Sequence, residues 1–139
     1  MIGCTAVAYD ERLKAAIFTL SGGNLQRIVA DTPYRKNIPR LSWLKVAAPI
    51  LAWLLRSLDP FRHVERISPR PVLFQNAIND EVIPRSGVEA LYRAAGAPKK
   101  ILWYDIAHSK QAMSSIDQLV RDALTWLQQQ NIAPPSPHL

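Results

Sequence analysis

The segment PVLFQNA, residues 71 to 77, gives the clearest indication of the fold of this chain. It is an apolar run of strand length, and a loop that contains Asp80 and Pro84 follows it. The helical pattern SGVEALYRAAG, residues 86 to 96, comes next, and KKILWYD, residues 99 to 105, predicts another strand. A strand, a helix and a strand in this order predict two parallel strands of an α/β layer. Within the helix, Ser86 is expected to cap the start and Gly96 the end.

Further elements extend this pattern in both directions. Residues 1 to 9 are small and apolar and predict the end of a helix, and AAIFTL, residues 15 to 20, is an apolar run without alternation. Such a run is typical of a parallel strand that is covered on both faces. Residues 114 to 130 place Ile116, Leu119, Val120, Ala123, Leu124 and Leu127 at helical spacing, which predicts an amphipathic closing helix. Residues 131 to 139 are expected to form a proline-rich tail.

Residues 24 to 60 interrupt the α/β pattern and predict a cap-like insertion. Within them, residues 41 to 58 predict a helix with a wide apolar surface and a kink at Pro49. The helix is too short and too charged to predict a membrane span. Packing on its own domain is favoured for this helix, with a cap over a hydrophobic pocket as a variant of that arrangement and binding at a membrane surface as a minor alternative.

Composition narrows the class of protein. The chain has 139 residues, of which 48% are hydrophobic, and this is enough for one domain with a core. One cysteine excludes an internal disulfide, and one cysteine with three histidines argues against a zinc cluster, so no metal or cofactor is expected. The start of the chain lacks the pattern of a secretory signal, and together these features favour a cytoplasmic setting. The net charge of +6 comes from scattered residues, which favours a solvated basic surface over nucleic-acid binding.

Two predicted loops contain residues of a catalytic kind. Asp80 follows the strand at 71 to 77, and His108 follows the strand at 99 to 105. Functional residues of open α/β sheets collect in loops at the carboxyl ends of strands. A carboxylate there can fix the tautomer of an imidazole that takes a proton from a nucleophile. His63 and His138 lack such a position and are expected at the surface.

The segments around these residues resemble a known family. SPRPVLFQNAINDEVIP and ALYRAAGAPKKILWYDIAH, followed by the closing helix, resemble the C-terminal half of α/β-hydrolases of the esterase and dienelactone-hydrolase type. DERLKAAIFTLSGGNL is similar to the strand after that family's nucleophile helix. The resemblance implies a partial α/β-hydrolase domain over residues 1 to 130, with about three parallel strands flanked by helices. It also implies that Asp80 is the triad acid, that His108 is the triad base, and that the substrate is a small-molecule ester or a related acyl compound.

The nucleophile of that family has no counterpart in this sequence. It sits in a Gly-x-Ser-x-Gly turn that precedes the acid and the base, and no such motif occurs in the 139 residues. Cys4 has Ile2 and Ala6 where the two glycines should be, so we expect it to be a core-facing helix residue. The sequence therefore predicts the C-terminal portion of a serine-type hydrolase whose nucleophile lies ahead of Met1.

Two further expectations concern interactions. A non-catalytic binding module that keeps the hydrolase half-fold is the alternative function, with the apolar helix at 41 to 58 as its contact surface. The strand at 15 to 20 contains no charge or proline, so an open edge there would favour self-association.

Overall fold

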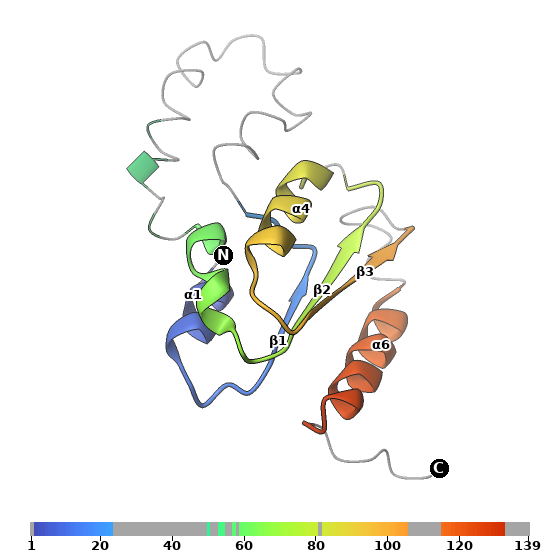
Figure 1. Cartoon of the computed structure of the whole chain (residues 1–139). Coiled ribbons are helices and arrows are strands. Elements are labelled where there is room, and N and C mark those ends of the chain that lie inside the picture. The colour runs from blue at the N-terminus through green and yellow to red at the C-terminus, as the bar shows by residue number, and fades with distance from the viewer. Residues whose placement is uncertain are drawn as a thin grey trace, which may run out of the picture.

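The described part of the chain forms a three-stranded parallel sheet with helices on both faces (Figure 1). The computed structural model describes residues 2–23, 50, 53–54, 57, 59–80, 82–105 and 115–132. The strands are β1 (Ala16–Thr19), β2 (Val72–Ala77) and β3 (Lys99–Tyr104), in the order β1-β2-β3. Both strand pairs are parallel, which confirms the predicted α/β class, and each strand is at most one residue shorter at either end than predicted.

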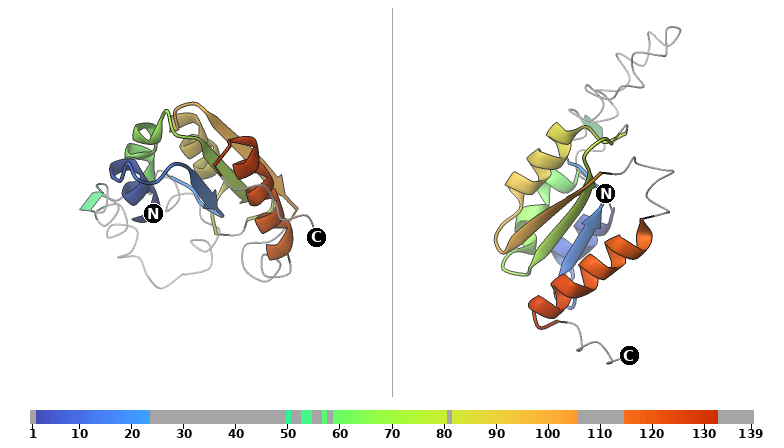
Figure 2. Two further views of the ribbon diagram at one scale, coloured as in Figure 1. Left: turned by 90° about the horizontal axis from the view of Figure 1, so that it is seen from below. Right: turned by 90° about the vertical axis from the view of Figure 1, so that its right-hand side faces the viewer.

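The central strand β2 determines how the layers form. All six of its residues are buried, because helices cover both sides of the sheet. Val72 and Phe74 face α1 (Ile2–Tyr9) and α4 (Arg85–Ala94), whereas Gln75 faces α6 (Ile116–Gln129). Figure 2 shows α4 and α6 on opposite faces of the sheet. The continuous apolar run of the sequence is thus a strand without a solvent-exposed side.

The larger core lies between β2 and the elements α1 and α4. It also includes two short 3₁₀ helices, η3 (Pro60–Arg62) and η4 (Val64–Ile67), which the sequence did not predict. Val64 and Ile67 are fully buried. The Asp59 carboxylate caps η3 by accepting a hydrogen bond of 3.0 Å from the Phe61 backbone N–H. This capped segment closes the sheet face between α1 and α4.

Most of the expected insertion at 24 to 60 lies outside the described residues, as does the tail beyond residue 132. Of the expected helix at 41 to 58, the structure describes Ile50, Trp53 and Leu54 as helical. Their side chains are 55%, 53% and 59% exposed, so these three positions present an apolar surface to solvent.

The ends of α4 differ from the prediction. The helix begins at Arg85, and its N-cap is Pro84, whose side chain makes no capping hydrogen bond. At its other end Ala95 leaves the helix in an extended conformation, so Gly96 is not needed for a left-handed turn. A Cβ atom at Gly96 would lie 2.5 Å from the Cβ of Ser68. The glycine therefore allows the close approach of two chain segments, and the two capping predictions are wrong.

The buried face of α6 is also narrower than predicted. Leu119 is buried, as is Trp126, which was not among the predicted contacts. In contrast, Ile116, Val120 and Leu124 are 52%, 50% and 51% exposed. Hydrogen bonds of α6 with Gln75 and Tyr104 set the rotation of the helix on the sheet. In this orientation three of the apolar side chains that were predicted to be buried face solvent.

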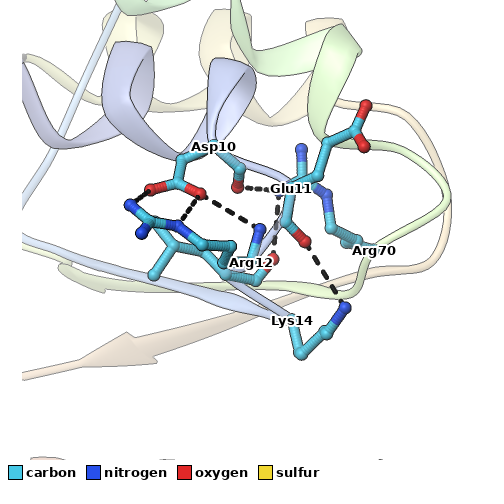
Figure 3. A network of polar contacts seen from close by, with 6 residues as sticks. Asp10, Glu11, Arg12, Lys14 and Arg70 are labelled. Atoms are coloured by element: carbon cyan, nitrogen blue, oxygen red, sulfur yellow. Dashed lines mark hydrogen bonds and ion pairs between the residues drawn. The ribbon is translucent and has the colours of Figure 1, made fainter.

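At the amino end of the sheet, a polar network joins the turn before β1 to the segment before β2 (Figure 3). Arg70 Nη1 donates hydrogen bonds to the carbonyl oxygens of Asp10 and Leu13, at 2.8 and 3.0 Å. The Arg12 guanidinium forms a 2.7 Å ion pair with Asp10 and holds the pKa of that carboxyl below its usual range. These contacts fix the point at which β1 enters the sheet.

Candidate active site at the carboxyl edge of the sheet

The loops after β2 and β3 start side by side. The ladder between the two strands continues past their ends, where the Ile78 N–H donates to the Tyr104 carbonyl at 2.8 Å. One residue further along, Asn79 Nδ2 donates to Asp105 Oδ1 at 3.0 Å. The loop that contains Asp80 is thereby tied to the beginning of the loop that leads toward His108.

The carboxylate of Asp80 has a defined orientation. Its Oδ1 atom accepts hydrogen bonds from the backbone N–H groups of Val82 and Ile83, both at 2.8 Å. An aspartate that bonds to the backbone two and three residues ahead stabilises its own turn. One oxygen of Asp80 is thus occupied by the loop, and the side chain is held half-buried at the carboxyl edge of the sheet.

His108 lies outside the described residues, three positions after Asp105 in the sequence. Its pairing with Asp80 stays a prediction. His138 also lies outside them. His63 is half-buried, and its ring contacts the Ser57 carbonyl at 2.6 Å and the Tyr9 hydroxyl at 3.4 Å. These contacts give His63 a structural position away from the candidate site.

A polar network around the buried Gln75 and Tyr104 fixes the two elements that flank the segment containing His108. Gln75 Nε2 donates to the Tyr104 hydroxyl at 3.0 Å and to the Leu119 carbonyl at 2.9 Å. The Tyr104 hydroxyl donates to Asp122 Oδ2 at 2.8 Å, and Thr19 Oγ1 donates to Gln75 Oε1 at 3.0 Å. Burial and the nearby Asp122 carboxylate raise the pKa of Tyr104 to about 12. The network holds the end of β3 and the start of α6 in a fixed relation to β2.

A second buried polar residue, Asn76, orders the carboxyl end of β1. It is 1% exposed, and its Oδ1 atom accepts a hydrogen bond of 2.9 Å from the Ser21 N–H. Leu20, the residue before Ser21, adopts a φ of 48° and turns the chain out of the sheet. Asn76 Nδ2 and Ser21 Oγ have no hydrogen-bond partner within the described part of the chain. Sequence reasoning missed both Gln75 and Asn76, although two polar residues inside an apolar strand were the available signal.

Cys4 lies in the core, as predicted. It is 3% exposed, and its thiol contacts the Pro60 carbonyl at 3.6 Å. Burial raises the pKa of the Cys4 thiol to about 11, and the Asp59 carboxylate adds to the effect. Because the thiolate is the nucleophilic form of cysteine, this protonated thiol is a poor nucleophile at neutral pH.

The described ranges provide few other candidate sites. No cluster of three or more His, Cys, Asp or Glu side chains among them could hold a metal ion. No helix in the same ranges is long and apolar enough to cross a membrane.

Comparison with known proteins identifies the fold. Neither a protein-family model nor a curated protein sequence matches the chain. Among solved structures, the α/β hydrolase GrgF from Penicillium sp. sh18 matches 92% of this chain with a TM-score of 0.62 and 15% identity. The esterase Pf2001 from Pyrococcus furiosus matches 91% with a TM-score of 0.64 and 10% identity. An acetyl xylan esterase from Paenibacillus sp. R4 matches 87% with a TM-score of 0.62 and 20% identity.

These matches cover most of this chain but only part of the other proteins. The chain spans 59%, 48% and 41% of the three matched chains, respectively. The described sheet and its helices therefore have the α/β-hydrolase fold, and the chain contains a part of that fold. This confirms the predicted fold class.

Proposed function

We propose that the chain is the C-terminal portion of a serine-type α/β-hydrolase that cleaves carboxylic esters or related acyl bonds. Asp80 is the acid and His108 the base of its triad, and the nucleophile lies outside the 139 residues, since no Gly-x-Ser-x-Gly motif occurs within them. A cytoplasmic setting is part of the proposal, because the single cysteine leaves no internal disulfide.

One observation supports this assignment most strongly. The carboxyl ends of β2 and β3 meet, and the Asn79–Asp105 hydrogen bond of 3.0 Å joins the two loops where they begin. Asp80 lies directly after Asn79, and His108 follows Asp105 by three residues. An acid and a base on adjacent strand ends can reach each other, as a triad requires. The two esterases among the matched structures support ester chemistry only by fold analogy.

The roles follow from the chemistry of acyl transfer. His108 takes the proton of the nucleophile as that atom attacks the ester carbonyl, and then gives the proton to the departing alcohol. In the second half of the cycle His108 takes a proton from water as the water oxygen attacks the acyl-enzyme, and it returns that proton to the nucleophile as the acid product leaves. Asp80 orients the imidazole and stabilises the imidazolium, and the turn that holds Asp80 Oδ1 keeps the carboxylate fixed during both steps.

The proposal is tested with a protein extended through the reading frame upstream of Met1. We expect that frame to contain Gly-x-Ser-x-Gly, the extended protein to hydrolyse p-nitrophenyl acetate, and the 139-residue chain to show almost no turnover. In the extended protein His108→Ala should abolish turnover. Asp80→Asn should lower kcat on the order of 10⁴-fold, as in other triads.

Two matched variants control for nonspecific effects. His63→Gln and Asp10→Asn change the same residue types away from the carboxyl edge of the sheet, and both should keep nearly full activity. The proposal fails if the upstream frame lacks the motif and the extended protein is inactive. It also fails if His108→Ala retains activity.

A non-catalytic binding module is the second candidate function. The observation in its favour is the exposure of Ile50, Trp53 and Leu54, which are apolar and more than half accessible. An extended protein that binds small apolar esters without hydrolysing them would support this candidate.

A further inference from the structure

We propose that a cavity at the amino end of the sheet binds a small organic carboxylate with a flat apolar body, such as an aromatic acid. The cavity has a volume of about 260 Å³ and lies between the starts of β2 and β3 and the last turn of α6. Because sites for drug-sized ligands span about 300–1,000 Å³, this cavity suits a smaller molecule. Side chains from these three elements and from the turns before the strands line it: Pro71, Pro98, Lys100, Trp126, Gln129 and Gln130.

Lys100 supplies the positive charge of this cavity. Side chains alternate between the two faces of a strand, so Lys100 lies on the same face of β3 as Tyr104, which contacts α6 through Asp122. Lys99 lies on the other face, where its Nζ donates to the Tyr92 carbonyl at 2.8 Å near the end of α4. Lys100 has no ion pair or hydrogen-bond partner for its ammonium group within the described ranges. This ammonium group is therefore the one that a ligand in the cavity can use.

Trp126 adds a hydrogen-bond donor to the lining. Its side chain is 4% exposed, and its indole N–H is a donor that normally finds a partner when tryptophan is buried. No described residue accepts a hydrogen bond from this indole. A ligand oxygen in the cavity would supply the acceptor, and the side-chain amides of Gln129 and Gln130 can donate to the same ligand.

The two prolines favour a ligand with an apolar body over a small inorganic ion. Proline has no backbone N–H, and the carbonyls of Pro71 and Pro98 already accept hydrogen bonds from the N–H groups of Ala16 and Val72, both at 3.0 Å. The proline rings therefore offer the cavity mainly apolar contact. A molecule whose carboxylate meets the lysine ammonium group can place a flat apolar body against these rings and the indole.

The end of α6 limits the negative charge of the ligand. The carbonyl groups at a helix C-terminus carry partial negative charge and disfavour anions. Here the Gln130 N–H donates to the Trp126 carbonyl at 3.1 Å, and the Asn131 N–H donates to the Gln128 carbonyl at 2.9 Å. These bonds reduce the negative potential without removing it. One lysine beside such a helix end therefore matches a singly charged carboxylate better than phosphate, which carries more than one negative charge at pH 7.

Titration of the 139-residue chain with sodium benzoate at pH 7, followed by nuclear magnetic resonance, tests the ligand class. The indole N–H resonance of Trp126, identified by its loss in Trp126→Phe, should shift with a Kd of about 1 mM or below. Benzamide keeps the shape without the charge, and acetate keeps the charge without the flat body. Both of these probes, and inorganic phosphate, should bind at least about tenfold more weakly. Comparable binding of any of the three would overturn the proposed ligand class.

A lysine substitution tests the position of the site. Lys100→Gln should weaken benzoate binding about tenfold or more, because the charge-assisted hydrogen bond is lost. Lys14→Gln is the matched control, since Lys14 is exposed and does not line the cavity, and it should leave the affinity unchanged. Full affinity in Lys100→Gln, or a Trp126 resonance that benzoate does not shift, overturns the proposal. Neither measurement depends on ester hydrolysis, so the outcome is independent of the proposed function.

Discussion

Replacing Tyr104 with phenylalanine removes one hydroxyl from the network that joins β2, β3 and α6. That hydroxyl accepts from Gln75 Nε2 at 3.0 Å and donates to Asp122 Oδ2 at 2.8 Å. Gln75 is 1% exposed, so the N–H group that loses its acceptor cannot reach water. An unsatisfied buried donor costs about 1–3 kcal/mol, and each lost hydrogen bond contributes about 1 kcal/mol. Together, the unsatisfied Gln75 donor and the lost bond to Asp122 should make Tyr104→Phe lower the free energy of unfolding by about 2–4 kcal/mol.

Urea unfolding at pH 7, followed by tryptophan fluorescence, measures this change. Tyr92→Phe is the matched control, because the Tyr92 ring packs against Phe74 and its hydroxyl has no hydrogen-bond partner in the described ranges. It should change stability by less than about 0.5 kcal/mol. Equal effects of the two variants would show that the network does not hold α6 on the sheet.

The remaining predictions concern four separate contacts. Burial raises the pKa of Tyr104 to about 12, above the value of about 10 in unfolded chains. The stability that the protonated Tyr104 hydroxyl contributes should therefore be present below about pH 10 and lost between about pH 10 and 12, and urea titrations at several pH values measure this loss. Cys4 should react with iodoacetamide only on unfolding, since it is 3% exposed and its thiol pKa is about 11; rapid labelling of the native chain would contradict its buried position. Arg70→Met should destabilise the chain by about 1–3 kcal/mol in urea unfolding, because the Asp10 and Leu13 carbonyls lose a charged donor. Asn79→Ala, which releases the loop of Asp80, should reduce kcat more than it reduces stability in the extended protein, and an unchanged kcat would argue against a positioning role.

The strands were predictable because each is a short apolar run, a pattern that indicates a buried parallel strand. An apolar run such as residues 71 to 77 must be covered on both sides, and the parallel order followed from the helix between two such runs. The position of Asp80 at a strand end followed from the same pattern. The segment at 60 to 67 was not predictable in this way, because its 3₁₀ turns depend on the Asp59 cap and on burial of Val64 and Ile67 against α1 and α4.

Other features depend on contacts between distant residues. Gln75 and Tyr104 are 29 positions apart in the chain, and the sequence contains no signal that their side chains meet. Their contacts with α6 set the rotation of that helix, so Ile116, Val120 and Leu124 are exposed although their spacing predicts burial. Similarly, Gly96 directly follows a helix, where a glycine predicts a cap, but its lack of a side chain instead lets the backbone lie close to Ser68. Local patterns identified the elements, and tertiary contacts determined which faces they bury.

The central claim is that Asp80 and His108 form the acid–base pair of a triad. The most direct measurement is the distance between the Asp80 carboxylate and the His108 imidazole in a crystal structure of the chain or of its extended form. We predict that one carboxylate oxygen lies about 2.6–3.2 Å from a ring nitrogen of His108, at the edge where the loops after β2 and β3 meet. A His108 side chain that points away from this edge, with another residue bonded to the second oxygen of Asp80, would contradict the account.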